Sequence, residues 1–149
     1  MFAQNTPEID SLIQQLKTTA GTQKADLLLS ISDACLRIAP EKSIAFANQA
    51  LQLSTAVGYP KGIGDSYNEL GIANYYLGQF TKALTNYKKS LDIREKLNFK
   101  KDIANSLNNI GLVYNALGSY NQSLQYGLKA LRTREEIGDK GYYIQPAKQ

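Results

Sequence analysis

The 149-residue chain contains no histidine and only one cysteine, Cys35. One cysteine cannot form a disulfide within the chain, and without histidine or further cysteines no metal site based on these ligands can be built. No apolar run approaches the roughly 18 residues that a membrane-spanning helix requires. We therefore expect a soluble segment that holds no metal and no cofactor and does not insert into a membrane.

The chain also lacks the motifs from which enzyme active sites are built. It has no glycine-rich loop between a strand and a helix, no clustered carboxylates and no histidine that could act as a base. Neither a phosphate cradle nor a nucleophile-base pair can therefore be assembled from its motifs. The sequence indicates a non-catalytic protein.

The composition is that of one ordinary domain. Hydrophobic residues make up 43% of the chain and charged residues 20%, which is enough apolar material for a buried core. The net charge of +4 is unevenly spread, because residues 61–149 hold 13 Lys or Arg against 8 Asp or Glu. Any basic patch must therefore belong to the second half of the chain.

Two consecutive blocks of forty residues, 61–100 and 101–140, share 13 identical positions. A fixed period of this length is typical of a solenoid built from stacked repeats. Residues 21–60 follow the same period in their second half. Their first half fits only if the internal turn is one residue shorter, which places Ser32 opposite Gly71, so we interpret this block as a diverged first repeat.

Helical periodicity and capping signals divide the chain into helices joined by short turns. Thr6 is expected to cap the first helix, with Pro7 at its first position. Gly78 and Gly118 lie where the chain must leave one helix and turn back, a position that favours positive φ. The predicted helices cover residues 7–19, 24 to before 40, 41 to 58, 62–77, 81–97, 102–117 and 121–137.

These elements predict an all-α fold, a right-handed superhelix of three helical hairpins preceded by one N-terminal helix. Five segments follow along the chain: the N-terminal helix (1–20), the diverged repeat (21–60), two regular repeats (61–100 and 101–140) and the truncated start of a further repeat or a tail (141–149).

Small residues are expected where the two helices of a hairpin approach closely. Gly71 is predicted to face Ala83 and Ser90, and Gly111 to face Ser123 and Ala130, because an unfavourable helical glycine needs the compensation of close packing. Large residues are expected to fill the space between repeats: Tyr67, Leu70, Phe80, Leu84, Tyr87 and Leu91 against Leu107, Ile110, Tyr120, Leu124 and Leu131.

The spacing of these residues resembles the tetratricopeptide repeat in its long form of about forty residues. The resemblance rests on Leu70-Gly71, Gly78, Phe80 and Ala83-Leu84, and on Ile110-Gly111, Gly118, Tyr120 and Ser123-Leu124. Asn74 and Gly127 depart from the pattern, since the other repeat has an aromatic at each position, and looser packing is expected there. Cys35 stands where the family buries an aromatic, which implies an inert core residue.

In this family the first helix of each pair lines a concave groove that binds an extended peptide or a partner helix. Carried over by position, the groove is lined by Asp26, Leu29, Asp33 and Leu36, then Asp65, Asn68, Ile72 and Tyr75, then Asn105, Asn108, Leu112 and Asn115. The groove lacks the lysines with which some members hold a C-terminal dicarboxylate. We therefore expect a neutral or slightly basic ligand segment.

Asn68 and Asn108 are the sharpest candidates for holding a ligand, because an amide offers both a donor and an acceptor to a peptide bond. The alternative is that these asparagines bond a neighbouring helix or face water, and this alternative is favoured for Asn109 and Asn115. The choice for Asn68 and Asn108 is left open by the sequence.

Basic residues gather mostly on the second helices and on the turns between repeats. A nucleic-acid surface needs such residues interleaved with stacking aromatics. The ten tyrosines instead recur at helical spacing, where they form core or groove wall. We expect a solvated outer wall rather than a nucleic-acid site, formed by Lys88, Lys89, Arg94, Lys96, Lys100, Lys101, Lys129, Arg132 and Arg134.

The repeat pair also resembles the arrays found in bacterial sensor histidine kinases of the Bacteroidetes type. This resemblance implies the sensory or interaction segment of a larger signalling protein on the exported side of the membrane. The Phe2-Ala3-Gln4 tail, which looks like the residue of a cleavage site, agrees with it. The alternative is a free-standing cytoplasmic adaptor or peptide receptor.

The last complete repeat should expose an apolar face meant for a neighbour. Tyr142, Tyr143 and Ile144 look like the opening turn of a fourth repeat. We expect either that the chain is a fragment of a longer protein or that this edge is buried in a homo-oligomer.

Overall fold

The structure is a computed structural model that describes residues 4–138, which form α-helices and one short 3-10 helix with no strand among them. The predicted tail at Phe2-Ala3 and the predicted start of a further repeat at 141–149 lie outside the described residues. The elements are α1 (Pro7–Gln15), η1 (Leu16–Thr18), α2 (Gly21–Cys35), α3 (Pro40–Ala56), α4 (Pro60–Tyr76), α5 (Phe80–Leu97), α6 (Lys100–Ala116) and α7 (Tyr120–Glu136).

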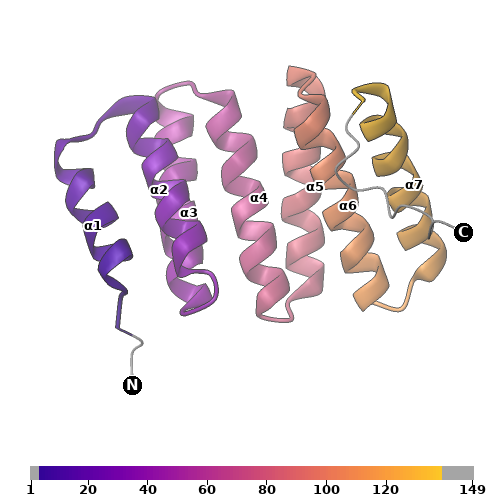
Figure 1. Ribbon diagram of the computed structural model, residues 1–149, viewed down its shortest axis with the longest axis horizontal. Helices are drawn as coiled ribbons and strands as arrows, with labels where there is room; N and C mark the ends of the chain where they lie inside the picture. Colours follow the sequence, from indigo (N-terminus) through magenta and orange to yellow (C-terminus); the bar gives the residue numbers. More distant parts are fainter. Residues whose placement is uncertain (1–3, 139–149) are drawn as a thin grey trace, which may run out of the picture.

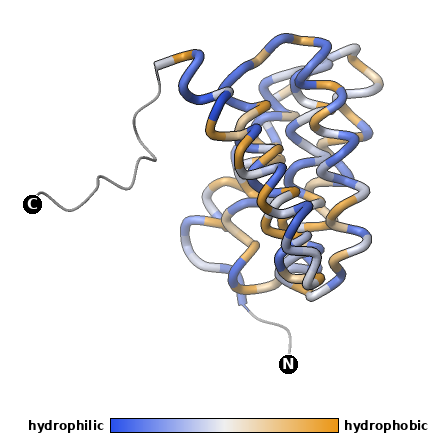
Figure 2. Tube along the Cα trace, turned by 90° about the vertical axis from the view of Figure 1, so that its right-hand side faces the viewer, coloured by the Kyte–Doolittle hydropathy of each residue, from blue (hydrophilic) through white to orange (hydrophobic). Residues whose placement is uncertain are grey.

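Successive helices run side by side as three antiparallel hairpins, α2 with α3, α4 with α5, and α6 with α7, preceded by α1 (Figure 1). Each hairpin packs against the next one along the chain, so the molecule is a row of helices rather than a closed bundle. Hydrophobic and hydrophilic residues alternate along the helices (Figure 2). This amphipathic pattern lets each hairpin bury one face against its neighbour. The predicted all-α fold of three hairpins is confirmed.

The local signals act as predicted. The Thr6 hydroxyl accepts a hydrogen bond from the backbone N–H of Ile9 at 3.3 Å, and Pro7 opens α1. Gly78 and Gly118 adopt φ of 71° and 76° in the turns within the second and third hairpins. The largest boundary differences concern α2, which begins at Gly21 instead of Lys24 and ends at Cys35 instead of just before Pro40, while the later helices differ from their predicted bounds by one or two residues. The predicted first helix ends as an α-helix at residue 15 and continues as the 3-10 turn η1.

The core is divided into clusters between neighbouring elements. Ile9 of α1 packs with Ile31 and Cys35 of α2. Cys35 is fully buried, as predicted, and burial raises the pKa of its thiol, which keeps it protonated and unreactive. The largest cluster lies between the second and third hairpins and joins Ala83 and Tyr87 of α5 to Ile110 and Val113 of α6.

The predicted partners of the two helical glycines need correction. A Cβ on Gly71 would lie 2.5 Å from Cδ1 of Tyr87, so the group nearest to Gly71 is this ring rather than Ala83 or Ser90. Ser90 instead donates a hydrogen bond to the backbone oxygen of Gly64 at 2.7 Å. The Tyr87 ring occupies this space because a large side chain fills the contact between the two helices without leaving a void.

In the third hairpin the glycine equivalent to Gly71 has different neighbours. A Cβ on Gly111 would lie 3.3 Å from the backbone oxygen of Ser123, as predicted, but its next neighbours are Tyr126 and Gly127 rather than Ala130. Gly127 takes the position of the tyrosine ring, and a Cβ built on it meets nothing within 4 Å. This space agrees with the looser packing predicted for that position.

Not all of the residues predicted to fill the space between repeats are buried. Phe80, Leu84 and Leu91 of α5 pack against the cluster shared with α6. Their equivalents forty residues later, Tyr120, Leu124 and Leu131, are 69%, 63% and 38% exposed, which corrects the prediction for these three. The reason is geometric, because within the described residues no helix follows α7 to cover them.

Candidate functional site

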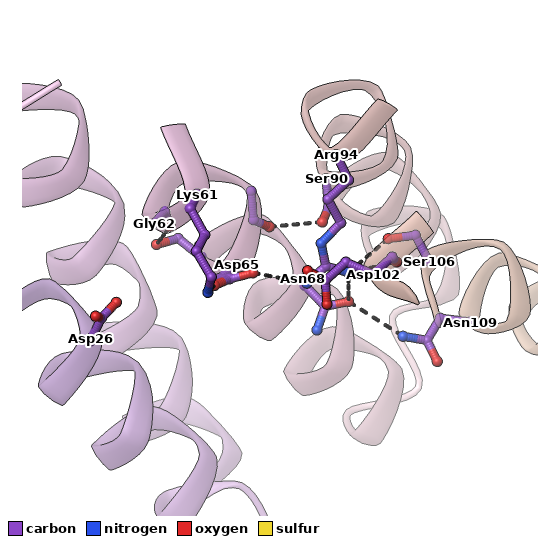
Figure 3. A network of polar contacts seen from close by, with 12 residues as sticks. Asp26, Lys61, Gly62, Asp65, Asn68, Ser90, Arg94, Asp102, Ser106 and Asn109 are labelled. Carbon is purple, nitrogen blue, oxygen red and sulfur yellow. Dashed lines mark hydrogen bonds and ion pairs between the residues drawn. The ribbon is translucent and has the colours of Figure 1, made fainter. Parts of the chain in front are cut away.

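A polar cavity of about 410 Å³ opens between α2 and α4. It brings together five residues that the sequence places in the groove: Asp26, Leu29, Asp33, Asp65 and Asn68. Four further lining residues were not predicted, namely Ser30, Lys61, Glu69 and Arg94. Part of this cluster is shown in Figure 3.

The other predicted groove residues are distributed along α4 and α6. Ile72 and Tyr75 are half-buried and pack against the apolar cluster of α5 and α6, and Asn105 is half-buried. Leu36, at only 6% exposure, is part of the core. The exposed positions that extend the face along α6 are Asn108, Leu112 and Asn115.

Arg94 is the central side chain of the site, although the sequence placed it on a solvated outer wall. Its side chain is 7% exposed and points from α5 between α4 and α6 (Figure 3). Nη2 donates to Asp65 Oδ1 at 3.0 Å, and Nη1 donates to Ser106 Oγ at 2.8 Å. Longer contacts join Nη1 to the backbone oxygen of Asp102 at 3.3 Å and to Asn68 Oδ1 at 3.4 Å. A buried guanidinium requires such partners, which corrects the outer-wall prediction for this residue.

Arg134 repeats the arrangement in the third hairpin. It is 6% exposed, and its Nη2 donates to Asn105 Oδ1 at 3.0 Å. The sequence held a signal for both arginines, because Arg94 and Arg134 are identical positions of the repeat. This signal is weak by itself, because Lys89 and Lys129 also recur at one place in the period and are exposed.

The two aligned asparagines are not equivalent. Oδ1 of Asn68 accepts hydrogen bonds from Arg94 and, at 3.3 Å, from Nδ2 of Asn109 on the next first helix (Figure 3). The alternative prediction, a hydrogen bond to a neighbouring helix, is therefore confirmed for Oδ1 of Asn68 and for Asn109. No described residue accepts a hydrogen bond from Nδ2 of Asn68, and Asn108 is exposed.

The charges around the cavity are unbalanced in favour of carboxylates. Both cations contact the same partner, since Lys61 Nζ lies 2.6 Å from Asp65 Oδ2 and Arg94 binds Oδ1 of that carboxylate. The hydrogen bond to Asp65 raises the pKa of Lys61. Asp26 accepts a hydrogen bond from the hydroxyl of Tyr59 at 2.9 Å, and burial together with this bond raises the pKa of Tyr59.

Glu69 is the most perturbed acid of the cavity. Burial, with the nearby charges of Asp33 and Asp65, raises its pKa to about 7, against the opposing effect of Arg94. Its Oε2 atom is buried and has no hydrogen-bond partner. The sequence did not single out Glu69, because nothing in its spacing distinguishes it from an exposed helical glutamate.

On the outer wall, lysines cover tyrosine rings. The Nζ atoms of Lys88, Lys89 and Lys129 lie 5.5, 5.3 and 5.2 Å from the ring centroids of Tyr114, Tyr67 and Tyr126. Contacts of this kind stabilise the helix faces and occupy the rings that a single-stranded nucleic acid would need for stacking.

Residues 4–138 hold neither a metal-binding cluster nor a membrane-spanning helix. No group of three or more acidic, cysteine or histidine side chains is arranged so that it could hold a metal ion. None of the helices in this range has the length and apolar character to cross a bilayer.

The hairpins are antiparallel, stack with a period of forty residues and line one face with their first helices. This arrangement defines a helical-repeat solenoid. The sequence profile of the tetratricopeptide repeat matches residues 35–96 and 62–136. The chain therefore belongs to the tetratricopeptide-repeat family, whose fold serves in general as an interaction scaffold.

Solved structures show the same fold. BtubC from P. vanneervenii is 19% identical with a TM-score of 0.78, over 95% of this chain and 60% of that one. Aspartyl phosphate phosphatase F from Bacillus subtilis is 19% identical with a TM-score of 0.77, over 88% and 38%. The tetratricopeptide-repeat domain of Arabidopsis FLU is 20% identical with a TM-score of 0.63, over 87% and 99%.

This chain thus spans less than two thirds of BtubC and of the phosphatase. At such low identity the similarity shows the fold alone. No curated protein sequence matches the chain. None of the three structures is described as a sensor histidine kinase array, and that part of the predicted resemblance stays a prediction.

Replacing Arg94 by methionine should destabilise the protein by about 3 kcal/mol, because it keeps the aliphatic stem but leaves Asp65 and Ser106 without their buried donor. The free energy of unfolding is measured by urea denaturation followed by circular dichroism. Lys96→Met is the control, since its ion pair with Asp92 is exposed, and it should change the free energy by no more than about 0.5 kcal/mol. Equal stabilities for the two variants would contradict a structural role for Arg94.

Proposed function

We propose that the protein is a non-catalytic module that binds a peptide or a protein segment on the face formed by α2, α4 and α6. The observation that carries this proposal is the cavity of about 410 Å³. It is lined by polar side chains from two successive first helices, α2 and α4. Ligand sites of this size are ordinary for proteins. Proteins of this family bind protein or peptide partners, which supports the assignment.

The chemistry of the face suits a neutral to slightly basic segment. Lys61 and Arg94 are both engaged by Asp65, so the remaining carboxylates of the cavity face the ligand without a matching cation. Along α6 the exposed amides of Asn108 and Asn115 and the side chain of Leu112 offer hydrogen bonds and apolar contact. An extended peptide presents both kinds of group at regular intervals.

Nucleic acid is a poor match for this surface. A phosphate backbone would meet carboxylates in the cavity, and lysine side chains lie over the rings of Tyr67, Tyr114 and Tyr126. A catalytic role lacks support as well, because no nucleophile is paired with a base at the site.

Peptides enriched from a displayed random library on the wild-type protein should bind the Asn108→Ala variant about fivefold more weakly, the cost of roughly one lost hydrogen bond. The dissociation constants are measured by fluorescence anisotropy with the enriched peptides. Asn48→Ala is the matched control, because Asn48 is exposed on the second helix α3, away from the face. Failure to enrich any peptide, or equal weakening by both substitutions, would count against the proposed binding face.

We further infer that this module is the sensory or interaction segment of a larger bacterial signalling protein, exported if the predicted resemblance to sensor kinases holds. The matching segments of BtubC and of the phosphatase are 60% and 38% of longer chains, which supports a modular role. The alternative is a free-standing cytoplasmic adaptor or peptide receptor.

An antiserum against residues 21–138 distinguishes these two possibilities on an immunoblot of the native source, fractionated into exported and cytoplasmic material. A band well above 16.5 kDa in the exported or membrane fraction is the expected result. A single cytoplasmic band at 16.5 kDa would establish the free-standing adaptor instead.

The exposed face of α7 supports a second role, self-association. Six exposed hydrophobic side chains lie on α7 or next to its two ends: Leu117, Tyr120, Leu124, Leu128, Leu131 and Ile137. Five of them are the forty-residue equivalents of Leu77, Phe80, Leu84, Leu91 and Leu97, which are all half-buried, and of these Phe80, Leu84 and Leu91 pack against the cluster shared with the next hairpin. The face thus has the character of an inter-repeat contact without its partner.

We propose that a second copy of this chain occupies this face, with α7 packed against α7. Judged from the exposed fractions, the six side chains present roughly 600 Å², the upper end of what monomers leave exposed. Two such faces together reach about 1,200 Å², the lower bound for a specific interface. A two-fold axis lets the same apolar stripe serve both protomers.

The wild-type protein should sediment as a dimer at micromolar concentration, and the double variant Leu124→Gln/Leu131→Gln as a monomer. Sedimentation velocity across a concentration series measures both species. Ile38→Gln should remain dimeric, because Ile38 is comparably exposed at 40% but lies after α2, in the first hairpin. A wild-type protein that stays monomeric at every concentration would exclude this role.

A further inference from the structure

Two polar atoms of the cavity lining are buried and have no hydrogen-bond partner, Oε2 of Glu69 and Nε of Arg94. Oε2 of Glu69, on α4, accepts no hydrogen bond and is screened from solvent, although its carboxyl group belongs to the cavity lining. A buried carboxylate oxygen without a donor costs free energy that a bound donor would recover. The chain itself therefore leaves the Glu69 carboxyl group incompletely satisfied, on the wall of a cavity that a ligand group can enter.

The repeat itself shows what kind of group is missing. With the one-residue shift of the first repeat, Asp26 corresponds to Asp65, which is held by the guanidinium of Arg94. Forty residues before Arg94, however, stands Ser54, which carries no charge. Asp26 receives only the hydroxyl of Tyr59 instead. The first repeat thus lacks the cation that the second and third repeats supply from within the chain.

The remaining charges of the cavity do not fill this gap. Lys61 and Arg94 both pair with Asp65, and within the described residues neither Asp33 nor Glu69 forms an ion pair. The cavity therefore holds two acids, one from α2 and one from α4, without a cationic partner.

An organic cation fits this cavity better than a metal ion. No three of the acids in the described region are arranged to hold a metal. The volume of about 410 Å³ is far larger than one ion needs, and Leu29 supplies an apolar contact for an aliphatic stem. Lysine and arginine side chains combine such a stem with a cationic end that carries several donors.

We propose that this cavity is a subsite for a basic side chain, lysine or arginine, of the bound segment, with Glu69 and Asp33 as its charged acceptors. The inference rests on the proposed peptide-binding function and names the residue type that the ligand inserts. Nδ2 of Asn68, on the same wall, donates to the ligand backbone beside the inserted side chain.

Titration of Glu69 gives the subsite a distinctive pH dependence. Its pKa of about 7 in the empty site reflects burial and the charges of Asp33 and Asp65, opposed by Arg94, and the phenol of Tyr87 lies nearby. A bound cation favours the charged carboxylate and lowers this pKa. The affinity for a basic side chain is therefore highest above pH 7. It decreases as the pH falls through 7, by about tenfold between pH 8 and pH 6.

The test uses small probes on the full chain. N-acetyl-arginine amide and N-acetyl-lysine amide are titrated into the protein at pH 8, with N-acetyl-citrulline amide as the neutral isostere of arginine, and binding is followed by NMR chemical shifts. We expect shifts centred on residues 26, 33 and 65–69, and at least tenfold tighter binding of a basic probe than of the citrulline probe. Equal binding of the basic and neutral probes would overturn the proposal.

Glu69→Gln should weaken binding of the basic probe at least tenfold at pH 8 and abolish the pH dependence of this binding between pH 6 and pH 8. Glu41→Gln is the matched control, because Glu41 is exposed on α3, and it should behave as the wild type. Thermal melts verify that each variant is folded. A folded Glu69→Gln protein that keeps the wild-type affinity and pH profile would exclude Glu69 as the acceptor and overturn the subsite.

The outcomes separate the subsite from the proposed function. Library peptides that bind through Asn108 but carry no lysine or arginine would overturn the subsite and leave the peptide-binding face intact. Basic probes that bind while no library peptide does would support the subsite and count against the wider face.

Discussion

A single buried guanidinium joins the candidate binding face to the stacking of the repeats. Arg94 extends from α5 and holds Asp65 on α4 and Ser106 on α6 with its two terminal nitrogens. Removing this charge from water is costly, so the arginine has to be surrounded by acceptors in a fixed arrangement. The angle between the second and third hairpins and the position of the cavity acids therefore depend on the same contact.

The two seams of the solenoid are built on different principles. Between the first and second hairpins, Ser54 lies against Gly62, and a Cβ on that glycine would collide with the serine hydroxyl. Between the second and third, the equivalent residues are Arg94 and Asp102, joined through a backbone carbonyl. The first seam is thus a close contact of small groups and the second a charged bridge. The cavity lies at the first seam, where the chain supplies no cation for Asp26 or Asp33.

This division gives the molecule two surfaces of opposite character. At α2 and α4, Asp33 and Glu69 form no ion pair within the described residues, while the exposed side of α7 is apolar because no described helix covers it. Lys88, Lys89 and Lys129 lie over the rings of Tyr114, Tyr67 and Tyr126. The polar cavity and the apolar side of α7 thus lie on different parts of the row of helices.

Local sequence by itself determined the helices, their order and the turns. Helix periodicity, the cap at Thr6 and the positive φ of Gly78 and Gly118 depend on neighbouring residues only, so they could be predicted, and the period of forty predicted the stacking of hairpins. About half of the candidate cavity, including Asp33 and Asp65, followed from its place on the first helices.

The tertiary structure decided the rest, because it depends on which groups from different helices compete for one space. Arg94 enters the seam although a helical arginine is usually solvated, and it takes the acceptor of Asn68 that the sequence offered to a ligand. Tyr87 fills the space at Gly71, which smaller residues were expected to take. Burial of Glu69 against Asp33 requires two helices to be packed before its pKa can change. Periodicity specifies which face a residue occupies, and only packing specifies what it meets there.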